Sequence, residues 1–375
     1  MITYNISVIL NESYPGIEQE ELIGSEITTQ PYDPRLIKID KDSFPVFQIM
    51  RKVENHEINL QPDFQRNFVW DEIRQSRLIE SMLIRIPLPS FYIDAINDGE
   101  WLVVDGLQRL NTLNNFINEE KLTLTGLEFL EQEIGGKRFS QIPRHLQRRL
   151  EETPLFCYII RPQTPIEAKF TIFRRLNTGG LVLTSQEIRH CLFHGESTRL
   201  LRELASSNEF KTATDNSISD ERMADMDLIL RFFAFYLTGY KLYKKPDLDT
   251  FLGDTMKAIN TKNDQDIISL KESFIGSMLK VFEVFGRYAF RKMYEKNGRK
   301  NPINKALFET WSVSLCEIDI DLIKSHKEKI VSKFIDVMNN DQGFNASITQ
   351  GTSDVGKVHY RFSTVENLIK ESIGQ

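Results

Sequence analysis

Residues 101–117 read WLVVDGLQRLNTLNNFI, and the hydrophobic pattern of this stretch changes at the dipeptide Asp105-Gly106. The apolar run Trp101–Val104 is typical of a strand that is buried on both faces. After Gly106 the apolar residues recur at the spacing of a helix, and they are Leu107, Leu110, Leu113 and Ile117. The stretch therefore predicts a strand, a glycine turn and a helix over 107–117.

The segments around this turn predict further short strands and helices. Asp71 is a suitable N-cap for a helix over 72–84, because its carboxylate can accept a backbone N–H of the first turn. The apolar runs 91–93 and 155–160 predict two more strands. The pattern at 166–176 predicts a helix. These elements together indicate a small domain of mixed helices and strands.

Helical periodicity dominates the chain after Gly195. We expect an N-terminal arm over 1–42, a small α/β domain over 43–195 and an all-helical domain over 196–340. The fold class is therefore α+β. Six helices are predicted in the second half, over 197–205, 221–240, 247–259, 264–291, 302–318 and 319–338.

The C-terminal tail, residues 341–375, is predicted to contain a short strand and a helix. Lys357, His359 and Arg361 alternate with apolar residues, which is typical of a strand with one basic face. Such a face can contact the backbone of DNA or RNA. An exposed edge strand that is protected by charge gives the same pattern.

The composition limits the kinds of partner. The net charge of −6 excludes a uniformly basic nucleic-acid coat, but residues 137–189 hold ten basic and four acidic residues. This stretch either faces phosphates or forms solvated helix faces. The three cysteines are far apart, which fits a reducing compartment, and no apolar run is long enough to cross a membrane. We expect a cytoplasmic protein without a membrane partner.

The turn at Asp105 has the chemistry of a phosphate site. Gly106 lets a ligand approach the backbone, and the start of the following helix offers free N–H groups and a positive dipole end. Arg109 can clamp phosphate oxygens, Asp105 can hold Mg²⁺ against them, and Gln108 can position water. Asn111 lies on the polar face of the same helix. The simpler alternative is a common strand turn in which Arg109 only pairs with Asp105.

Two other segments carry a similar set of side chains. The cluster PDFQRNFVW at 62–70 contains Gln65 and Arg66, and the segment RRLNTGG at 174–180 contains a further arginine. If the three segments converge on one anion, the pocket gains residues that bind a nucleotide. The predicted nucleotide-binding residues are Gln65, Arg66, Gly106, Asn111, Thr112, Arg175, Asn177, Thr178 and Gly179.

These blocks also carry a resemblance to a known family. Three blocks closely resemble, in the same order, the N-terminal domain of GmrSD-type restriction endonucleases. They are Phe64-Gln65-Arg66 with Trp70, residues 104–110, and residues 173–180 with 183–189. That domain is related to the ParB/sulfiredoxin-like fold. The resemblance covers roughly residues 43 to 195 and implies a small α/β domain with a nucleotide site.

The resemblance implies binding and hydrolysis of a nucleoside triphosphate, often in systems that act against phage. The Asp-Gly-Gln-Gln-Arg motif of the relatives falls on residues 105–109, where Leu107 replaces the first glutamine. The loss of this amide favours binding over hydrolysis. Long relatives also carry a His-Asn-His nuclease domain, but only His326 and His359 lie beyond residue 200. We expect a stand-alone form without that domain.

Three functions remain open from the sequence. The first is a metal-dependent NTPase of the ParB-like class in phage defence or DNA metabolism, with Asp105, Gln108 and Arg109 as catalytic residues and Mg²⁺ as cofactor. The second is a module that binds a nucleotide or nucleic acid without turnover and signals to a partner defence protein. The third is a metal-dependent DNA nuclease at the same site, with Asp105 as the metal ligand.

Overall fold

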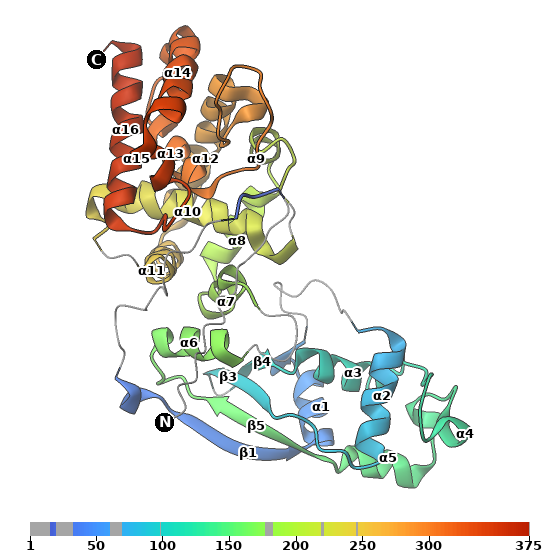
Figure 1. Ribbon diagram of the computed structural model, residues 1–375. Helices are drawn as coiled ribbons and strands as arrows, with labels where there is room; N and C mark the ends of the chain where they lie inside the picture. Colours follow the sequence, from blue (N-terminus) through green and yellow to red (C-terminus); the bar gives the residue numbers. More distant parts are fainter. Residues whose placement is uncertain are drawn as a thin grey trace, which may run out of the picture. The chain divides into compact units, whose positions relative to one another are not determined.

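The computed structural model describes residues 16–19, 33–60, 70–97, 99–176, 183–218, 221–244 and 247–374. The chain forms two compact units. One unit is Tyr32–Val182, and the other joins Met1–Pro31 to Leu183–Gln375. The first unit contains a small sheet and the second is helical, so the predicted α+β class is confirmed (Figure 1).

The first unit is built on a five-stranded mixed sheet with the strand order β1-β5-β3-β4-β2. The parallel pairs are β3 with β5 and β2 with β4, and the other two neighbouring pairs are antiparallel. The predicted strands near Phe91, Trp101 and Leu155 are all present. The bounds are β1 Ile39–Pro45, β2 Ile58–Asn59, β3 Phe91–Asn97, β4 Glu100–Asp105 and β5 Pro154–Ile160.

Helices cover the two faces of this sheet unequally. One face shares a single hydrophobic core with four helices. They are α1 Val46–Glu54, α2 Glu72–Leu83, α3 Leu107–Ile117 and α5 Arg144–Glu151. Figure 1 shows α1, α2 and α3 of this set beside the sheet. On the opposite face, α6 (Ile166–Leu176) reaches β3 through an ion pair between Lys169 Nζ and Asp94 Oδ1 at 2.6 Å. Short elements complete the unit, namely η1 Pro34–Leu36, α4 Glu131–Ile134 and η2 Phe139–Gln141.

Local sequence signals explain the ends of α2 and α3. Asp71 caps α2 as predicted, because its carboxylate accepts the backbone N–H of Arg74 at 2.7 Å. The helix α3 has the predicted bounds. The prediction that β4 is buried on both faces is wrong at its start, since Trp101 and Leu102 are only half-buried.

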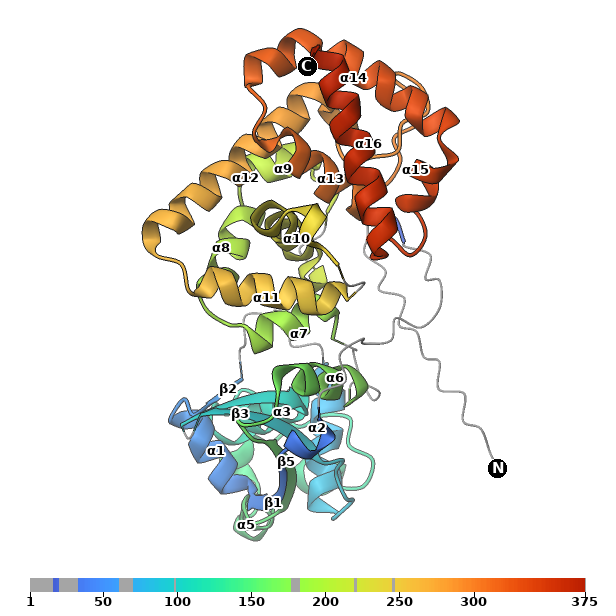
Figure 2. The ribbon, with the colours of Figure 1, turned by 90° about the vertical axis from the view of Figure 1, so that its left-hand side faces the viewer.

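The second unit packs its helices around α10 (Ala224–Thr238), whose residues 224–235 are all buried. All six helices that were predicted in this half are present. Figure 2 shows α14 and α16 side by side in this unit. Within the described residues, no helix combines the length and apolar character that a membrane span needs. The remaining helices are α7 Ser185–Leu192, α8 Glu196–Ala205, α9 Asn208–Ala213, α11 Leu248–Asn260, α12 Asp264–Phe285, α13 Lys305–Cys316, α14 Ile320–Asn340, α15 Gln342–Ser347 and α16 Val355–Ile373, with η3 Glu221–Met223, η4 Tyr240–Leu242 and η5 Gly286–Tyr288.

The strand predicted in the C-terminal tail is wrong. Residues 355–373 form the helix α16, which Asp354 caps by accepting the N–H of Lys357. The alternation of apolar residues over 358–362 is too short to distinguish a strand from a helix, and the stripe Val358, Phe362, Val365 and Ile369 continues at helical spacing.

A short piece of the N-terminal arm binds to the helical unit. Ile17 is buried and forms a parallel bridge with Ile303. The backbone N–H of Glu18 donates to the carbonyl of Ile303 at 2.7 Å, and the Glu18 carboxylate accepts from Lys292 Nζ at 2.6 Å. The arm therefore contributes to the unit formed by the C-terminal half, so the sheet-containing unit is an insertion between two parts of the helical one.

Candidate functional site

The turn between β4 and α3 depends on the glycine at position 106. Gly106 has a φ angle of 101° and is the N-cap residue of α3. A Cβ atom at this position would lie 2.3 Å from Cδ1 of Phe91, whose ring is buried. Both the left-handed backbone and the close approach of the Phe91 ring therefore require glycine here.

Arg109 is buried beneath this turn. Its guanidinium donates to the carbonyl of Pro89, to the carbonyl of Ser90 at 3.2 Å and to Oδ2 of Asp105 at 3.0 Å. It also lies 4.3 Å above the centre of the Phe91 ring. Burial holds the pKa of Arg109 below its ordinary value, and the neighbouring Asp105 carboxylate only partly offsets this shift. Arg109 thus joins the turn to the chain entering β3, and both of its terminal nitrogens are occupied.

Asp105 and Gln108 are the partly exposed residues of the turn, whereas Gly106 and Leu107 are buried. The Asp105 side chain is 38% exposed, and Arg109 contacts only its Oδ2 atom. No side chain caps α3, so its first backbone N–H groups point out of the helix beside this carboxylate. Gln108 is half-buried in the first turn. A phosphate at the helix start, with a cation against Asp105, fits this arrangement of groups.

Asn111 and Thr112 have partners within the domain. Asn111 Nδ2 donates to the carbonyl of Leu60 at 3.2 Å, and Thr112 Oγ1 donates to the carbonyl of Gln108 at 2.8 Å. Thr112 is fully buried, so it stabilises α3 from inside. Leu60 is the last described residue before the segment that holds Gln65 and Arg66. Asn111 therefore connects Leu60 to α3.

The far end of the same segment is also connected to α3. Gln75 Nε2 on α2 donates to the carbonyl of Trp70 at 2.9 Å, and Asn115 Nδ2 on α3 donates to Oε1 of Gln75 at 3.4 Å. Gln65 and Arg66 themselves lie outside the described residues, as do Asn177, Thr178 and Gly179. Arg175 is described and exposed in the last turn of α6. The predicted convergence of the three segments stays a prediction.

The sequence did not single out the polar residues on the strand beside the turn. Tyr92 on β3 is the register partner of Asp105 on β4. Burial, followed by the neighbouring Tyr158 and Asp105, raises the pKa of Tyr92. Asp94, two residues further, is buried against Lys169, and burial raises the pKa of its carboxyl although Lys169 opposes the shift. The sequence signal for this buried ion pair was an aspartate inside the mainly apolar stretch FYIDAIN at 91–97.

The three residues predicted as a nucleic-acid face do not form one. Arg361 is 1% exposed, donates to the carbonyl of Thr352 at 2.7 Å and forms an ion pair with Glu309. His359 Nε2 lies 3.2 Å from the carbonyl of Tyr243, and Lys357 Nζ donates to the carbonyl of Gln350. Because α16 is a helix, these side chains point in different directions, and Arg361 is inside the unit.

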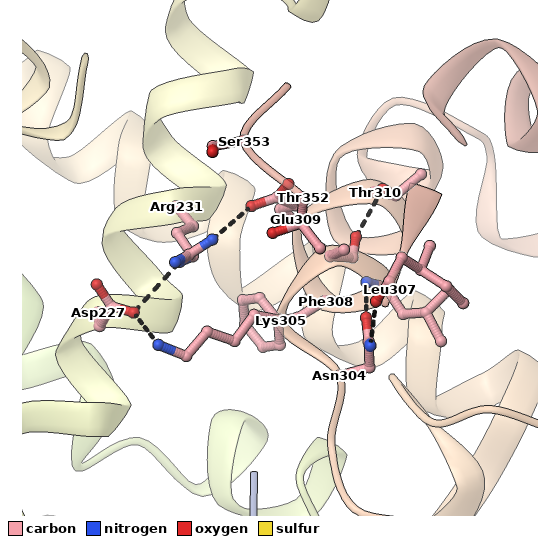
Figure 3. Close-up of polar contacts among 12 residues, drawn as sticks. Asp227, Arg231, Asn304, Lys305, Leu307, Phe308, Glu309, Thr310, Thr352 and Ser353 are labelled. Atoms are coloured by element: carbon pink, nitrogen blue, oxygen red, sulfur yellow. Dashed lines mark hydrogen bonds and ion pairs between the residues drawn. The ribbon is translucent and has the colours of Figure 1, made fainter. Parts of the chain in front are cut away.

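Arg361 belongs, through its ion pair with Glu309, to a buried network of charges in the helical unit. Figure 3 shows the part of this network that joins Asp227, Arg231, Lys305 and Glu309. Asp227 accepts from Lys305 Nζ at 3.0 Å and from Arg231 Nε at 3.2 Å, and Arg231 Nη1 reaches Glu309 at 3.4 Å. Burial alone would raise the pKa of Asp227, but the nearby cations hold it well below its usual range. Each carboxylate is matched by more than one cation, which is the arrangement that buried charges require.

Residues 46–194 match the family model of the GmrSD restriction endonuclease, N-terminal domain. The match covers strands β2 to β5, the four core helices, the Asp105 turn and α7, and it begins directly after β1. No curated protein matches the chain. The matched family is that of a domain of restriction endonucleases.

Proposed function

We propose that residues 46–194, which belong to the GmrSD restriction endonuclease N-terminal domain family, bind a nucleoside triphosphate at the Asp105 turn. In this proposal the chain hydrolyses the nucleotide with Mg²⁺ and acts in phage defence or DNA metabolism. The observation that carries it is the uncapped start of α3 beside the exposed carboxylate of Asp105.

The electrostatics of the turn favour a nucleotide with its metal over a free anion. A phosphate at the helix start would lie close to Asp105, and the two negative groups would repel each other unless a cation lies between them. Mg²⁺ is commonly held by one or two carboxylates together with substrate phosphates and water. Asp105, with one oxygen free of Arg109, supplies one such ligand.

Within this proposal Arg109 is a positioning residue. Its contacts with Pro89, Ser90 and Asp105 fix the orientation of the carboxylate and of the turn. Leu107 is buried in the core of the domain, so it anchors α3 and leaves Gln108 as the amide that can position water. Hydrolysis therefore depends on Gln108 and Asp105.

A second candidate function is binding without turnover, in which the nucleotide-bound domain signals to a partner protein. It is favoured by the occupied guanidinium of Arg109, since a clamp on the γ-phosphate would need a free arginine. A nuclease at this turn is a weaker candidate. No group of three or more potential metal ligands occurs among the described residues.

The test combines binding and turnover on the full chain. Thermal melting with each nucleoside triphosphate, with and without Mg²⁺, should show a stabilising shift that Asp105→Asn removes. This substitution keeps an oxygen for Arg109 but removes the charge. Asp40→Asn, which changes an exposed aspartate on β1, serves as the matched control. Phosphate release above the Asp105→Asn level supports the NTPase, whereas a shift without release supports binding alone. An unchanged melting temperature with every nucleotide would contradict both.

A further inference from the structure

Three aromatic side chains lie next to one another on the face of the sheet opposite the hydrophobic core. Tyr92 of β3 and Tyr158 of β5 are register partners, and their rings stack with centres 5.0 Å apart and an interplanar angle of 15°. Phe156 lies two residues before Tyr158 on β5, so it points to the same face. We call Phe156, Tyr158 and Tyr92 the aromatic face.

The aromatic face lies at the open end of the sheet. The other end is covered, as Asp94 pairs with Lys169 of α6 and Ile160 is fully buried. Phe156 is instead 48% exposed, and both tyrosines are only half-buried. Neighbouring aromatic side chains that are left partly exposed on one face of a sheet form an apolar patch. Such patches often mark binding sites.

Successive side chains of β1 point to opposite faces of the sheet, and this separates its basic and acidic residues. Lys41 and Ser43 pair with Tyr158 and Phe156 and therefore lie on the same face. Asp40 and Asp42, the neighbouring acids, point to the other side. Lys41 is exposed, and its Nζ atom lies 5.9 Å from the centre of the Tyr158 ring. The open part of the face thus offers a cation and a hydroxyl.

We propose that the aromatic face binds single-stranded nucleic acid, with one base stacked on Phe156, the next on the face of Tyr92 that points away from Tyr158, and Lys41 at a phosphate. Residues two apart on a strand are about 6.6 Å from each other, which is close to the spacing of successive nucleotides in an extended single strand. Stacking on aromatic rings with a cation along the backbone is the usual means of sequence-tolerant binding. The face is distinct from the helix start proposed for the nucleotide.

The position of Tyr92 connects this surface with the turn. Tyr92 is the register partner of Asp105. A single-stranded nucleic acid that crosses the aromatic face would therefore reach the proposed nucleotide site. A duplex cannot present its bases in this way, as they are already paired and stacked. The inference does not depend on nucleotide hydrolysis, and it can be tested without added nucleotide.

The experiment measures fluorescence anisotropy of labelled twelve-nucleotide single strands, one of DNA and one of RNA, with the full-length chain. Phe156→Ser should weaken binding about tenfold or more, because removal of one stacking ring has effects of this size. Lys41→Gln should reduce the salt dependence by about one phosphate contact. The matched control is Phe129→Ser, since Phe129 is 72% exposed on a loop that Glu80 holds against α2.

Melting curves of each variant show whether it is folded, and Phe156 and Phe129 are exposed enough for both substitutions to be tolerated. Weaker binding by Phe156→Ser alone supports the aromatic face as the site. The proposal is overturned if neither single strand binds, if Phe129→Ser weakens binding equally, or if a duplex of the same sequence binds as tightly as the single strands.

Discussion

Arg109→Gln tests whether Arg109 is a structural connector or a phosphate clamp. In the structure its guanidinium satisfies the carbonyls of Pro89 and Ser90 and one oxygen of Asp105, and it stacks on Phe91. A glutamine cannot reach all of these groups, so buried carbonyls lose their donors. An unsatisfied buried polar group costs about 1–3 kcal/mol, and loss of one partner of a buried ion pair costs about 3–5 kcal/mol.

The free energy of unfolding should therefore fall by about 3 kcal/mol. We discount the ion-pair figure because Asp105 is 38% exposed and regains water when Arg109 is removed. For a domain of about 150 residues this corresponds to a decrease in melting temperature of roughly 6–12 °C. The decrease should occur without nucleotide, because the lost contacts are internal.

The assay is urea unfolding followed by circular dichroism, repeated as a thermal melt without ligand. The control is Arg77→Gln, because Arg77 is exposed on α2 of the same domain and contacts Glu128 at 3.3 Å on the surface. This control should change stability by less than about 0.5 kcal/mol. If Arg109→Gln is as stable as the Arg77 variant and has lost only the response to nucleotide, Arg109 is a clamp and our interpretation of its contacts is wrong.

Three further predictions concern other parts of the chain. Gly106→Ala should destabilise the domain by about 2–4 kcal/mol in urea unfolding, because the new Cβ meets the buried ring of Phe91 at a positive φ angle; an unchanged midpoint would show that the turn can relax. Lys169→Met should cost more stability at pH 7 than at pH 5. Burial raises the pKa of Asp94, so the folded state takes up a proton as the pH falls toward that raised pKa and the unpaired charge disappears; an equal loss at both pH values would refute this. Ile17→Ala should lower the melting temperature of the helical unit by an amount equivalent to about 2 kcal/mol, whereas no change would mean that the N-terminal segment adds no stability.

The sequence predicted the elements whose signals are local. The helix over 107–117 and the cap at Asp71 depend on a glycine turn, an apolar stripe and one side-chain acceptor, all within a few residues. The strand predicted at Lys357 failed because five alternating residues fit either periodicity, and packing then decided for a helix. Arg361 lies inside the unit since its partner Glu309 comes from α13, which no local pattern reveals.

The same distinction between local and distant partners applies to the candidate site. Residues 105–109 indicate an anion site because the glycine and the helix start are adjacent in the chain. Arg109 looks like a free phosphate ligand in the sequence, whereas its actual partners Pro89 and Ser90 lie on the chain entering another strand, twenty and nineteen residues away. A guanidinium that donates to backbone carbonyls and whose charge is balanced by Asp105 adds little to anion binding. In the proposed site, nucleotide affinity would therefore come from the backbone N–H groups of α3, a cation bound at Asp105 and the arginines of the neighbouring segments. Arg66→Ala, measured beside Arg109→Gln, should for this reason lower nucleotide affinity without lowering stability.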